Sequence, residues 1–423
     1  MRVLSMGSRG SDVMEIQSVL LKIGYNPGLI DGVFGRKTEQ AVKQFQKDFG
    51  LTEDGVIGTE TFSVLQRFLL GYDTYIVRPG DTIYSIARKY YTTMNKIFSA
   101  NPGINAYNLT IGQKLVIPYG IQVVDTNINY TYDIMERDIQ GLKARYPFIQ
   151  VGTAGKSVLG SNLYYIKLGT GPNEVFYNGA HHGLEWITSV LLMKFIEDFS
   201  EAYVEGDILR GYNVRDIWKQ STIYIIPMVN PDGVDLVING LQRDNPYYSR
   251  LIQWNKGSTD FSSDWEANNR GVDLNHNYDA SWELSKAAEA SYGVYGPGPT
   301  RYSGTMPESE PESKAVADFT RNHNFRLVIA YHSQGKVIYW TYLNIIPEDS
   351  PRIVKLFADV SGYTPAQTYG IVSYAGYKDW FIDKFRRPGF TIEVGIGKNP
   401  LPISQFNEIY NDNIGILLLG SIV

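Results

Sequence analysis

Three short apolar runs, each followed closely by a side chain that can bind a metal, limit the folds open to this chain more than any other feature. The runs are rich in the β-branched and aromatic residues typical of strands and cover residues 174–178, 326–330 and 389–392. They are followed by His182, His332 and Glu393. Because the carboxyl ends of parallel strands meet at one edge of an α/β sheet, we expect these side chains to converge there.

The sequence after the first run has the ligand types of a zinc site. Glu185 follows His182 by three positions, which places the two groups about one helical turn apart or across a tight turn. Catalytic zinc keeps three nitrogen or oxygen ligands from the protein and one water. A His-x-x-Glu step also arises by chance, and a buried histidine bonded to a glutamate needs no metal. The strand-end positions, and the presence of only 5 histidines in the chain, favour a catalytic Zn²⁺ site of His182, Glu185 and His332.

Composition excludes several classes of protein. A formal net charge of -5 gives no basic footprint, so nucleic acid is not an expected partner. No apolar run approaches the roughly 18 residues of a membrane span, so we expect none. The lack of cysteine excludes disulfides and thiolate metal sites. The first ten residues lack the apolar core of a signal peptide, so a classical secretion signal is not expected.

A repeated turn organises the N-terminal part of the chain. Residues 31–35 read Asp-Gly-Val-Phe-Gly, and residues 54–58 read Asp-Gly-Val-Ile-Gly. Residues 13–23 and 38–47 carry apolar positions at helical spacing. The pattern predicts a small helical bundle over residues 1–72. It resembles the peptidoglycan-binding domain of many bacterial wall hydrolases, which implies peptidoglycan as a partner.

A second short unit, residues 73–119, is expected to begin and end as strands around two short helices. It contains Val-x-Pro-Gly-Asp-Thr at 77–82, Asn-Pro at 101–102 and Gly-x-x-Leu-x-Ile-Pro at 112–118. Each proline motif alone would be an ordinary turn. The ordered set resembles the LysM domain. That resemblance implies a small α+β (βααβ) fold that binds chains containing N-acetylglucosamine, such as peptidoglycan or chitin.

The remaining segment, residues 126–423, alternates strand-like and helical patterns. The helical patterns include residues 187–199 and 312–321. The strand-like runs are residues 163–167, 174–177, 222–228, 327–331 and 390–394. Such alternation predicts an α/β domain with a mixed, mostly parallel sheet flanked by helices. The whole chain is therefore expected to be multidomain.

Further polar motifs accompany the metal triplet. They are Asn-Arg-Gly-Val-Asp-Leu-Asn-His-Asn-Tyr at 269–278, Tyr-Ala-Gly-Tyr-Lys-Asp-Trp at 374–380 and Phe-Thr-Ile-Glu at 390–393. Together with His182, Glu185 and His332 they resemble the zinc metallocarboxypeptidases of the carboxypeptidase A type. The resemblance implies that these three residues bind Zn²⁺. It also implies that Glu393 takes the proton of the attacking water and returns it to the leaving amine.

The same resemblance implies three further roles. Arg270 would stabilise the tetrahedral oxyanion, although its spacing to Asn275 is shorter than in the pancreatic enzymes. Asn275 would hold the terminal carboxylate of the substrate. A tyrosine closes over the substrate in this family, and Tyr369, Tyr374 and Tyr377 compete for the role, with Tyr374 preferred.

The departures from the family pattern bear on the substrate. The residue after Asn275 is commonly an arginine that clamps the terminal carboxylate, and here it is His276. The arginine common between the first two ligands is replaced by Leu184. Lys378 stands where the family has the residue that lines the specificity pocket, and its ammonium would favour an acidic side chain there. The alternative is a solvated surface lysine.

Peptidoglycan contains a residue with a carboxylate in its side chain, meso-diaminopimelate. With its two wall-binding modules, the chain is similar to the γ-D-glutamyl-diamino acid endopeptidases of spore-forming bacteria. A zinc hydrolase of the γ-D-glutamyl–meso-diaminopimelate bond in stem peptides is therefore expected, located at the cell wall, on spores or outside the cell. The alternatives are a general zinc carboxypeptidase anchored to the wall and an inactive wall-binding protein.

Overall fold

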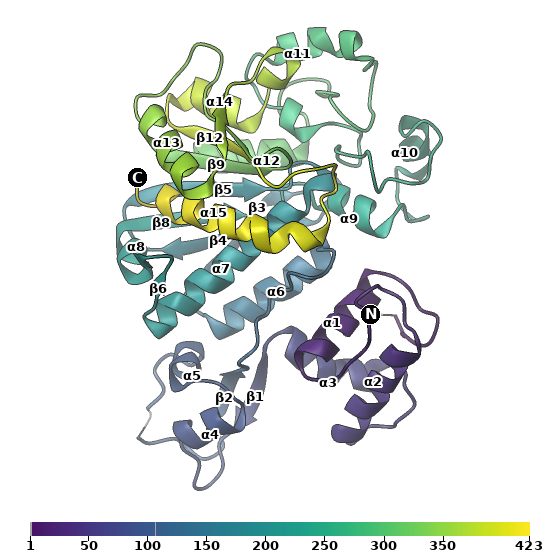
Figure 1. Ribbon diagram of the computed structural model, residues 1–423, viewed down its shortest axis with the longest axis vertical. Helices are drawn as coiled ribbons and strands as arrows, with labels where there is room; N and C mark the ends of the chain where they lie inside the picture. The colour runs from purple at the N-terminus through teal and green to yellow at the C-terminus, as the bar shows by residue number, and fades with distance from the viewer. Residues whose placement is uncertain (1, 106) are drawn as a thin grey trace. The chain divides into compact units, whose positions relative to one another are not determined.

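The computed structural model describes residues 2–105 and 107–423, which divide into two compact units (Figure 1). The first unit comprises the chain up to Asn129 with Asp133–Ile149 and Glu197–Asp207. The second comprises Tyr130–Tyr132, Gln150–Ile196 and Ile208–Val423. No helix within the described ranges is long and apolar enough to cross a membrane.

The first unit starts with three helices, α1 (Ser11–Lys22), α2 (Arg36–Asp48) and α3 (Thr59–Leu69). The repeated turns are held by equivalent glutamines of α1 and α2. The Gln17 Nε2 donates to Asp31 Oδ1 over 3.1 Å, and the Gln46 Nε2 donates to Asp54 Oδ1 over 2.8 Å. Each copy of the repeated sequence therefore forms the same turn, which is held by the side-chain amide of a buried glutamine.

The LysM-like part follows as β1 (Tyr72–Ile76), α4 (Ile83–Lys89), α5 (Met94–Ala100) and β2 (Lys114–Pro118), with β1 and β2 antiparallel. The Thr82 side chain caps α4 by accepting from the Ser85 N–H. The Asn101 Nδ2 donates to the Ile97 and Val116 carbonyls over 2.8 and 2.7 Å. Asn101 therefore joins α5 to β2, which explains its place in the motif.

The second unit is built on a mixed eight-stranded sheet in the order β11-β10-β12-β9-β5-β8-β4-β3. Its strands are β3 (Gln150–Lys156), β4 (Asn162–Gly169), β5 (Asn173–Gly179), β8 (Ser221–Ile226), β9 (Leu327–His332), β10 (Val337–Tyr339), β11 (Thr364–Ala366) and β12 (Gly389–Glu393). The central strands β12, β9, β5 and β8 are parallel, whereas β10 pairs antiparallel with β12 and β4 with β8. Strands β8 and β9 are buried along their whole length, as is typical of parallel strands covered on both faces.

The other elements are helices, short 3-10 turns and one small hairpin (Figure 1). The helices are α6 (Tyr132–Arg145), α7 (Ile187–Glu205), α8 (Val214–Gln220), α9 (Pro231–Asn239), α10 (Tyr248–Trp254), α11 (Trp282–Ala288), α12 (Pro311–Arg321), α13 (Ser350–Ser361), α14 (Tyr377–Phe385) and α15 (Phe406–Gly420). The 3-10 turns are η1 (Gly183–Glu185), η2 (Leu274–His276), η3 (Glu289–Tyr292), η4 (Gly370–Ser373) and η5 (Ile403–Gln405), and the hairpin is β6 (Ile208–Leu209) with β7 (Tyr212–Asn213).

Neighbouring residues of β5 show that the central sheet is covered on both faces. Phe176 packs 5.4 Å, between ring centroids, from Phe319 of α12. The Tyr177 hydroxyl donates to the Leu417 carbonyl of α15 over 2.9 Å. Because consecutive strand residues point to opposite faces, α12 and α15 lie on opposite sides. This confirms the predicted α/β architecture; the edge strands β3 and β11, and β10 beside β11, had no sequence prediction.

Candidate active site

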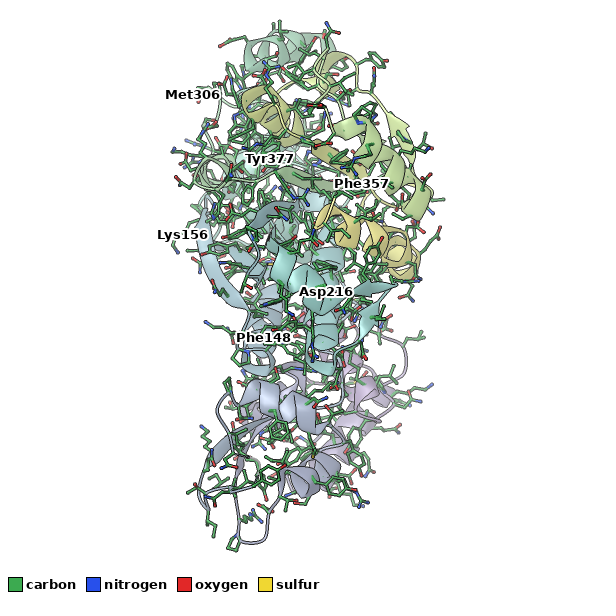
Figure 2. The ribbon with its side chains drawn as sticks, turned by 90° about the vertical axis from the view of Figure 1, so that its left-hand side faces the viewer. Phe148, Lys156, Asp216, Met306, Phe357 and Tyr377 are labelled. Atoms are coloured by element: carbon green, nitrogen blue, oxygen red, sulfur yellow. The ribbon has the colours of Figure 1, made fainter. Side chains whose placement is uncertain are left out.

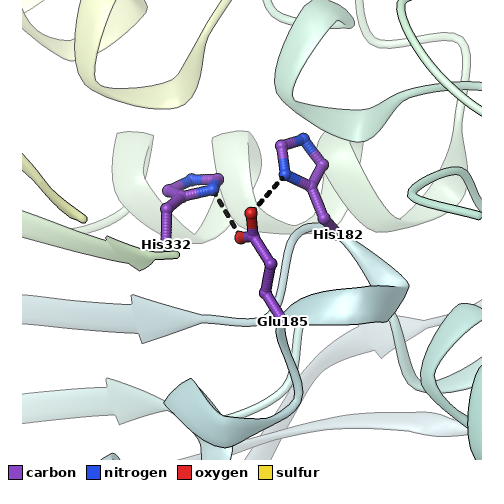
Figure 3. A group of neighbouring side chains, drawn as sticks. All are labelled: His182, Glu185 and His332. Carbon is purple, nitrogen blue, oxygen red and sulfur yellow. Dashed lines mark ion pairs between the residues drawn. The ribbon is translucent and has the colours of Figure 1, made fainter. Parts of the chain in front are cut away.

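The three predicted metal ligands converge at the carboxyl ends of neighbouring parallel strands (Figure 3). Gly179 at the end of β5 pairs with Tyr331 of β9, so the segments that carry His182 and His332 emerge side by side. Glu185 lies in η1, directly after His182. The Glu185 carboxylate lies 3.1 Å from His182 Nδ1 and 2.9 Å from His332 Nδ1.

The donor atoms of this cluster fit a zinc ion. The cluster is one of two groups among the described residues whose ligand atoms all lie within 4.8 Å of one another. His182 Nδ1 and Glu185 Oε2 are buried and lie within ion-pair distance of other members of the cluster, yet neither makes a hydrogen bond of good geometry. Buried polar atoms without a partner are costly, so an ion between them would repay that cost. Two imidazoles and a carboxylate are also the ligand types that catalytic zinc prefers.

Asp273 positions the first of these ligands and was given no role in the sequence prediction. Its Oδ1 lies 3.1 Å from His182 Nε2 and accepts from the Asn275 N–H, and its Oδ2 accepts from the Arg301 N–H over 2.8 Å. A carboxylate on the outer nitrogen holds the proton there and leaves Nδ1 free for the metal. The second group of possible ligands, His182, Glu266 and Asp273, shares His182 with the first. We therefore regard Asp273 as a positioning residue.

The charges of the cluster match this arrangement. Although burial favours the neutral acid, His182 and His332 lower the pKa of Glu185 to about 2. Burial, and then repulsion by Glu185, raises the pKa of Glu393 well above its ordinary value. Glu393 ends β12, where it pairs with His332 of β9. The predicted base therefore lies one strand away from a ligand, in surroundings that favour proton uptake.

A pocket of about 240 Å³ extends from the cluster. Its walls include two ligands, Glu393 and the predicted substrate residues Asn275, His276 and Lys378. They also include residues that the sequence analysis did not identify: Glu266, Asp273, Thr300, Arg301, Tyr339, Thr368, Val372, Gly376, Asp379 and Thr391. A more open cavity of about 860 Å³ shares Glu266 and Thr300 with it and includes Leu184. The cluster therefore has a small pocket on one side and an open groove on the other.

Lys378 lies inside the pocket rather than on the surface. Its side chain is 4% exposed, and Nζ donates to the Thr341 carbonyl over 2.5 Å and to the Asp379 carboxylate. Burial raises the pKa of Asp379 against the effect of Lys378. The pocket thus presents a buried ammonium, already paired with one carboxylate.

His276 and Asn275 line the pocket as expected. Burial lowers the pKa of His276, so its imidazole is neutral near pH 7, and Nδ1 lies 3.2 Å from Ser285 Oγ. His276 therefore supplies no positive charge. Asn275 accepts from the Tyr377 N–H over 3.0 Å through Oδ1, so its Nδ2 is the group available to a ligand.

Arg270 is not brought into the pocket. Its Nε donates to the Tyr247 hydroxyl over 3.3 Å, and Nη1 lies 3.7 Å from Glu310. The backbone turns at Gly271, where φ is 70°, and the Asn268 Oδ1 accepts from the Arg270 N–H. This turn directs the guanidinium away from the pocket walls.

The three candidate tyrosines have different surroundings. Tyr377 is fully buried, and its hydroxyl lies 2.9 Å from Thr320 Oγ1, which excludes a closing movement (Figure 2). Tyr374 follows η4 and is partly buried. Tyr369 is 77% exposed and follows Thr368, a pocket residue. None of the three is itself among the described pocket walls, whereas Tyr339 of β10 is.

Comparisons with known proteins agree with this geometry. The family model described as zinc carboxypeptidase matches residues 135–415, a peptidoglycan binding domain matches residues 9–65, and a LysM domain matches residues 75–118. The γ-D-glutamyl-L-diamino acid endopeptidase 1 of Lysinibacillus sphaericus is 42% identical in an alignment of 397 residues that covers 82% of this chain and 98% of that protein.

More distant proteins share the catalytic fold. Carboxypeptidase B of Bos taurus is 26% identical over 57% of this chain and 56% of its own length. The structure of bovine thrombin-activatable fibrinolysis inhibitor in complex with tick carboxypeptidase inhibitor superimposes with a TM-score of 0.52 at 22% identity, over 70% of this chain and 97% of that chain. These two proteins show that the catalytic fold also occurs outside bacteria.

Proposed function

This chain belongs to the zinc carboxypeptidase family and is a zinc metallopeptidase, and from that premise we propose that it cleaves the γ-D-glutamyl–meso-diaminopimelate bond of peptidoglycan stem peptides. The observation that carries the proposal is the buried ammonium of Lys378 in the pocket beside the metal ligands. The name of the Lysinibacillus relative and the wall-binding domains support the same substrate.

The residues of the pocket divide the reaction between them. Zinc, when held by His182, Glu185 and His332, polarises a carbonyl oxygen and makes water a nucleophile at neutral pH. Glu393 accepts the proton of that water and delivers it to the departing amine.

The two cavities suit the two sides of the scissile bond. The open groove has room for the glutamyl side of the stem peptide, which continues toward the glycan. The small pocket accepts the diamino acid, whose distal carboxylate meets Lys378. Tyr369, by its exposure beside the pocket, is a stronger candidate than Tyr374 to close over it.

The wall-binding domains indicate association with the cell wall, where this substrate occurs. We extend the proposal to the walls of spores, because the expected enzyme class comes from spore-forming bacteria. Isolated spore peptidoglycan and vegetative peptidoglycan are each treated with equal amounts of protein, and the released diaminopimelate is quantified. The comparison shows which of the two walls is the better substrate.

Mass spectrometry of L-Ala-γ-D-Glu-meso-diaminopimelate treated with zinc-loaded protein tests the bond assignment. We expect free diaminopimelate, slower cleavage of the matched peptide with lysine in its place, and no cleavage by Glu393→Gln with its zinc retained. Removal of ordinary C-terminal residues from unrelated peptides would instead establish a general carboxypeptidase. Binding to peptidoglycan without any cleavage would establish a wall-binding protein only.

A further inference from the structure

Arg301 is the cation of the substrate pocket that has no counter-ion. It lies on the segment between η3 and α12, and its side chain is partly buried. Among the described residues no carboxylate is within ion-pair distance of its guanidinium, whose Cζ lies 5.5 Å from the ring centroid of Tyr292. Lys378, in contrast, already has the Asp379 carboxylate as an ion-pair partner. A guanidinium in a pocket is the natural partner of a ligand carboxylate.

The backbone of Arg301 is fixed relative to the metal ligands. Its N–H donates to the Asp273 carboxylate over 2.8 Å, and the Asp273 N–H donates to the Tyr302 carbonyl over 2.8 Å. The same carboxylate binds His182 and the Asn275 N–H. One buried aspartate therefore fixes the position of a metal ligand and of the backbone at Asn275 and Arg301.

This frame identifies which substrate carboxylate is recognised. The α-carboxylate of the diamino acid is attached to the same carbon as the scissile nitrogen, so its partners must lie close to the metal ligands. Asn275 and Arg301 meet that condition through Asp273. The distal carboxylate lies at the far end of the diamino acid side chain, where Lys378 can meet it.

We propose that Arg301, with Asn275, binds the free α-carboxylate of the diamino acid released from the substrate. Arg301 thereby replaces the arginine that the family resemblance led us to expect at position 276, where a neutral His276 stands. This inference rests on the proposed function. It predicts that a stem tripeptide, which ends in this carboxylate, is cleaved faster than a tetrapeptide, in which the carboxylate is an amide.

The test compares two substrates and four proteins. The substrates are L-Ala-γ-D-Glu-meso-diaminopimelate and the same peptide with its α-carboxylate converted to a carboxamide. The proteins are the wild type, Arg301→Gln, Arg301→Lys and the control Arg386→Gln, which removes an arginine that is 62% exposed. Thermal midpoints and zinc content establish that each variant is folded and loaded.

We expect the wild type and Arg386→Gln to prefer the carboxylate substrate by on the order of ten-fold or more in kcat/KM. Arg301→Gln should cleave both substrates at about the rate of the carboxamide, and Arg301→Lys should keep part of the preference. Calorimetry should show the same pattern without catalysis, because Arg301→Gln should bind free meso-diaminopimelate more weakly than the wild type.

A carboxylate preference that survives in Arg301→Gln, or a wild type without any preference, would overturn the assignment of Arg301. Failure of the wild type to cleave either peptide would instead overturn the proposed function. That failure is seen before any variant is compared.

Discussion

Asp273 is the residue on which the geometry of the site depends most. It connects His182, Asn275 and Arg301 through hydrogen bonds to its two oxygens, yet it is outside the expected first coordination sphere. Although burial favours the neutral acid, the neighbouring His182 lowers the pKa of Asp273, so the carboxylate stays ionised. An ionised carboxylate on the outer nitrogen makes the imidazole a better ligand.

Asp273→Asn should weaken zinc binding by about 10- to 100-fold, because the amide lacks the negative charge and offers only one acceptor oxygen to the donors that the two carboxylate oxygens serve. Competition with a chromophoric chelator measures the affinity. Asp264→Asn is the control, because that carboxylate is 75% exposed. Equal zinc affinity in Asp273→Asn and the wild type would show that Asp273 does not support the ligand.

Glu312 should make stability depend on pH. It is buried in α12, accepts from the Val158 N–H over 2.9 Å, and its pKa is raised to about 8, chiefly by burial. The folded state therefore keeps a proton that the unfolded state releases near pH 4.5. Its stabilising contribution is complete below that pH and is lost as pH rises toward about 8.

Urea unfolding of the wild type and Glu312→Gln at several pH values checks this. The free energy of unfolding of the wild type should fall relative to the variant by up to about 1.4 kcal/mol per pH unit in that window. If the free energies of unfolding of the two proteins changed with pH in parallel, the raised pKa assigned to Glu312 would be wrong.

At the scale of elements, the site depends on how η1 follows β5. The short turn carries Glu185 back toward His182 and packs closely on the start of α9. A Cβ at Gly183 would lie 2.6 Å from the Gly233 carbonyl oxygen, which belongs to backbone and cannot move aside cheaply. Because η1 packs so closely on α9, η1 cannot shift easily, and this fixes the position of Glu185.

Gly183→Ala should destabilise the protein by about 1–3 kcal/mol through overpacking and should also weaken zinc binding, because η1 must shift. Thermal unfolding and a chelator titration measure the two effects. Gly296→Ala is a matched control, since a Cβ there would meet no atom within 4 Å. Similar stabilities and zinc affinities for the two variants would show that η1 can accommodate a Cβ at position 183.

At the scale of the whole molecule, wall binding and catalysis reside in separately folded cores. The N-terminal helices enclose an apolar cluster around Phe34 and Phe45, and the LysM part encloses another around Ile86 and Ile97. Neither cluster includes a residue of the metal cluster. Binding to the wall should therefore not need the metal.

Removal of zinc by a chelator should abolish hydrolysis while the full chain still sediments with insoluble peptidoglycan. Readdition of zinc should restore hydrolysis, because the ligands are held by the sheet and not by the ion alone. Release of the chain from peptidoglycan on chelation would show that the active site itself supplies most of the wall affinity.

Much of the chemistry of the site could be predicted from the sequence alone. The residue types of His182, Glu185 and His332 predict a zinc site, the family resemblance predicts Glu393 as the base, and the apolar runs before these residues predict parallel strand ends that meet. These signals are local, so they can be read without the fold. The same is true of the repeated glycine turns and of the ordered LysM motif.

Only the tertiary structure decided which polar side chains enter the pocket. Arg270 belongs to a promising motif, but the turn at Gly271 directs it toward Glu310, whereas Arg301 has no motif and lines the pocket. Tyr377 was a candidate to close the site and is locked in the core. The direction of a side chain depends on backbone turns and on contacts with residues far away in the sequence, which no local pattern records.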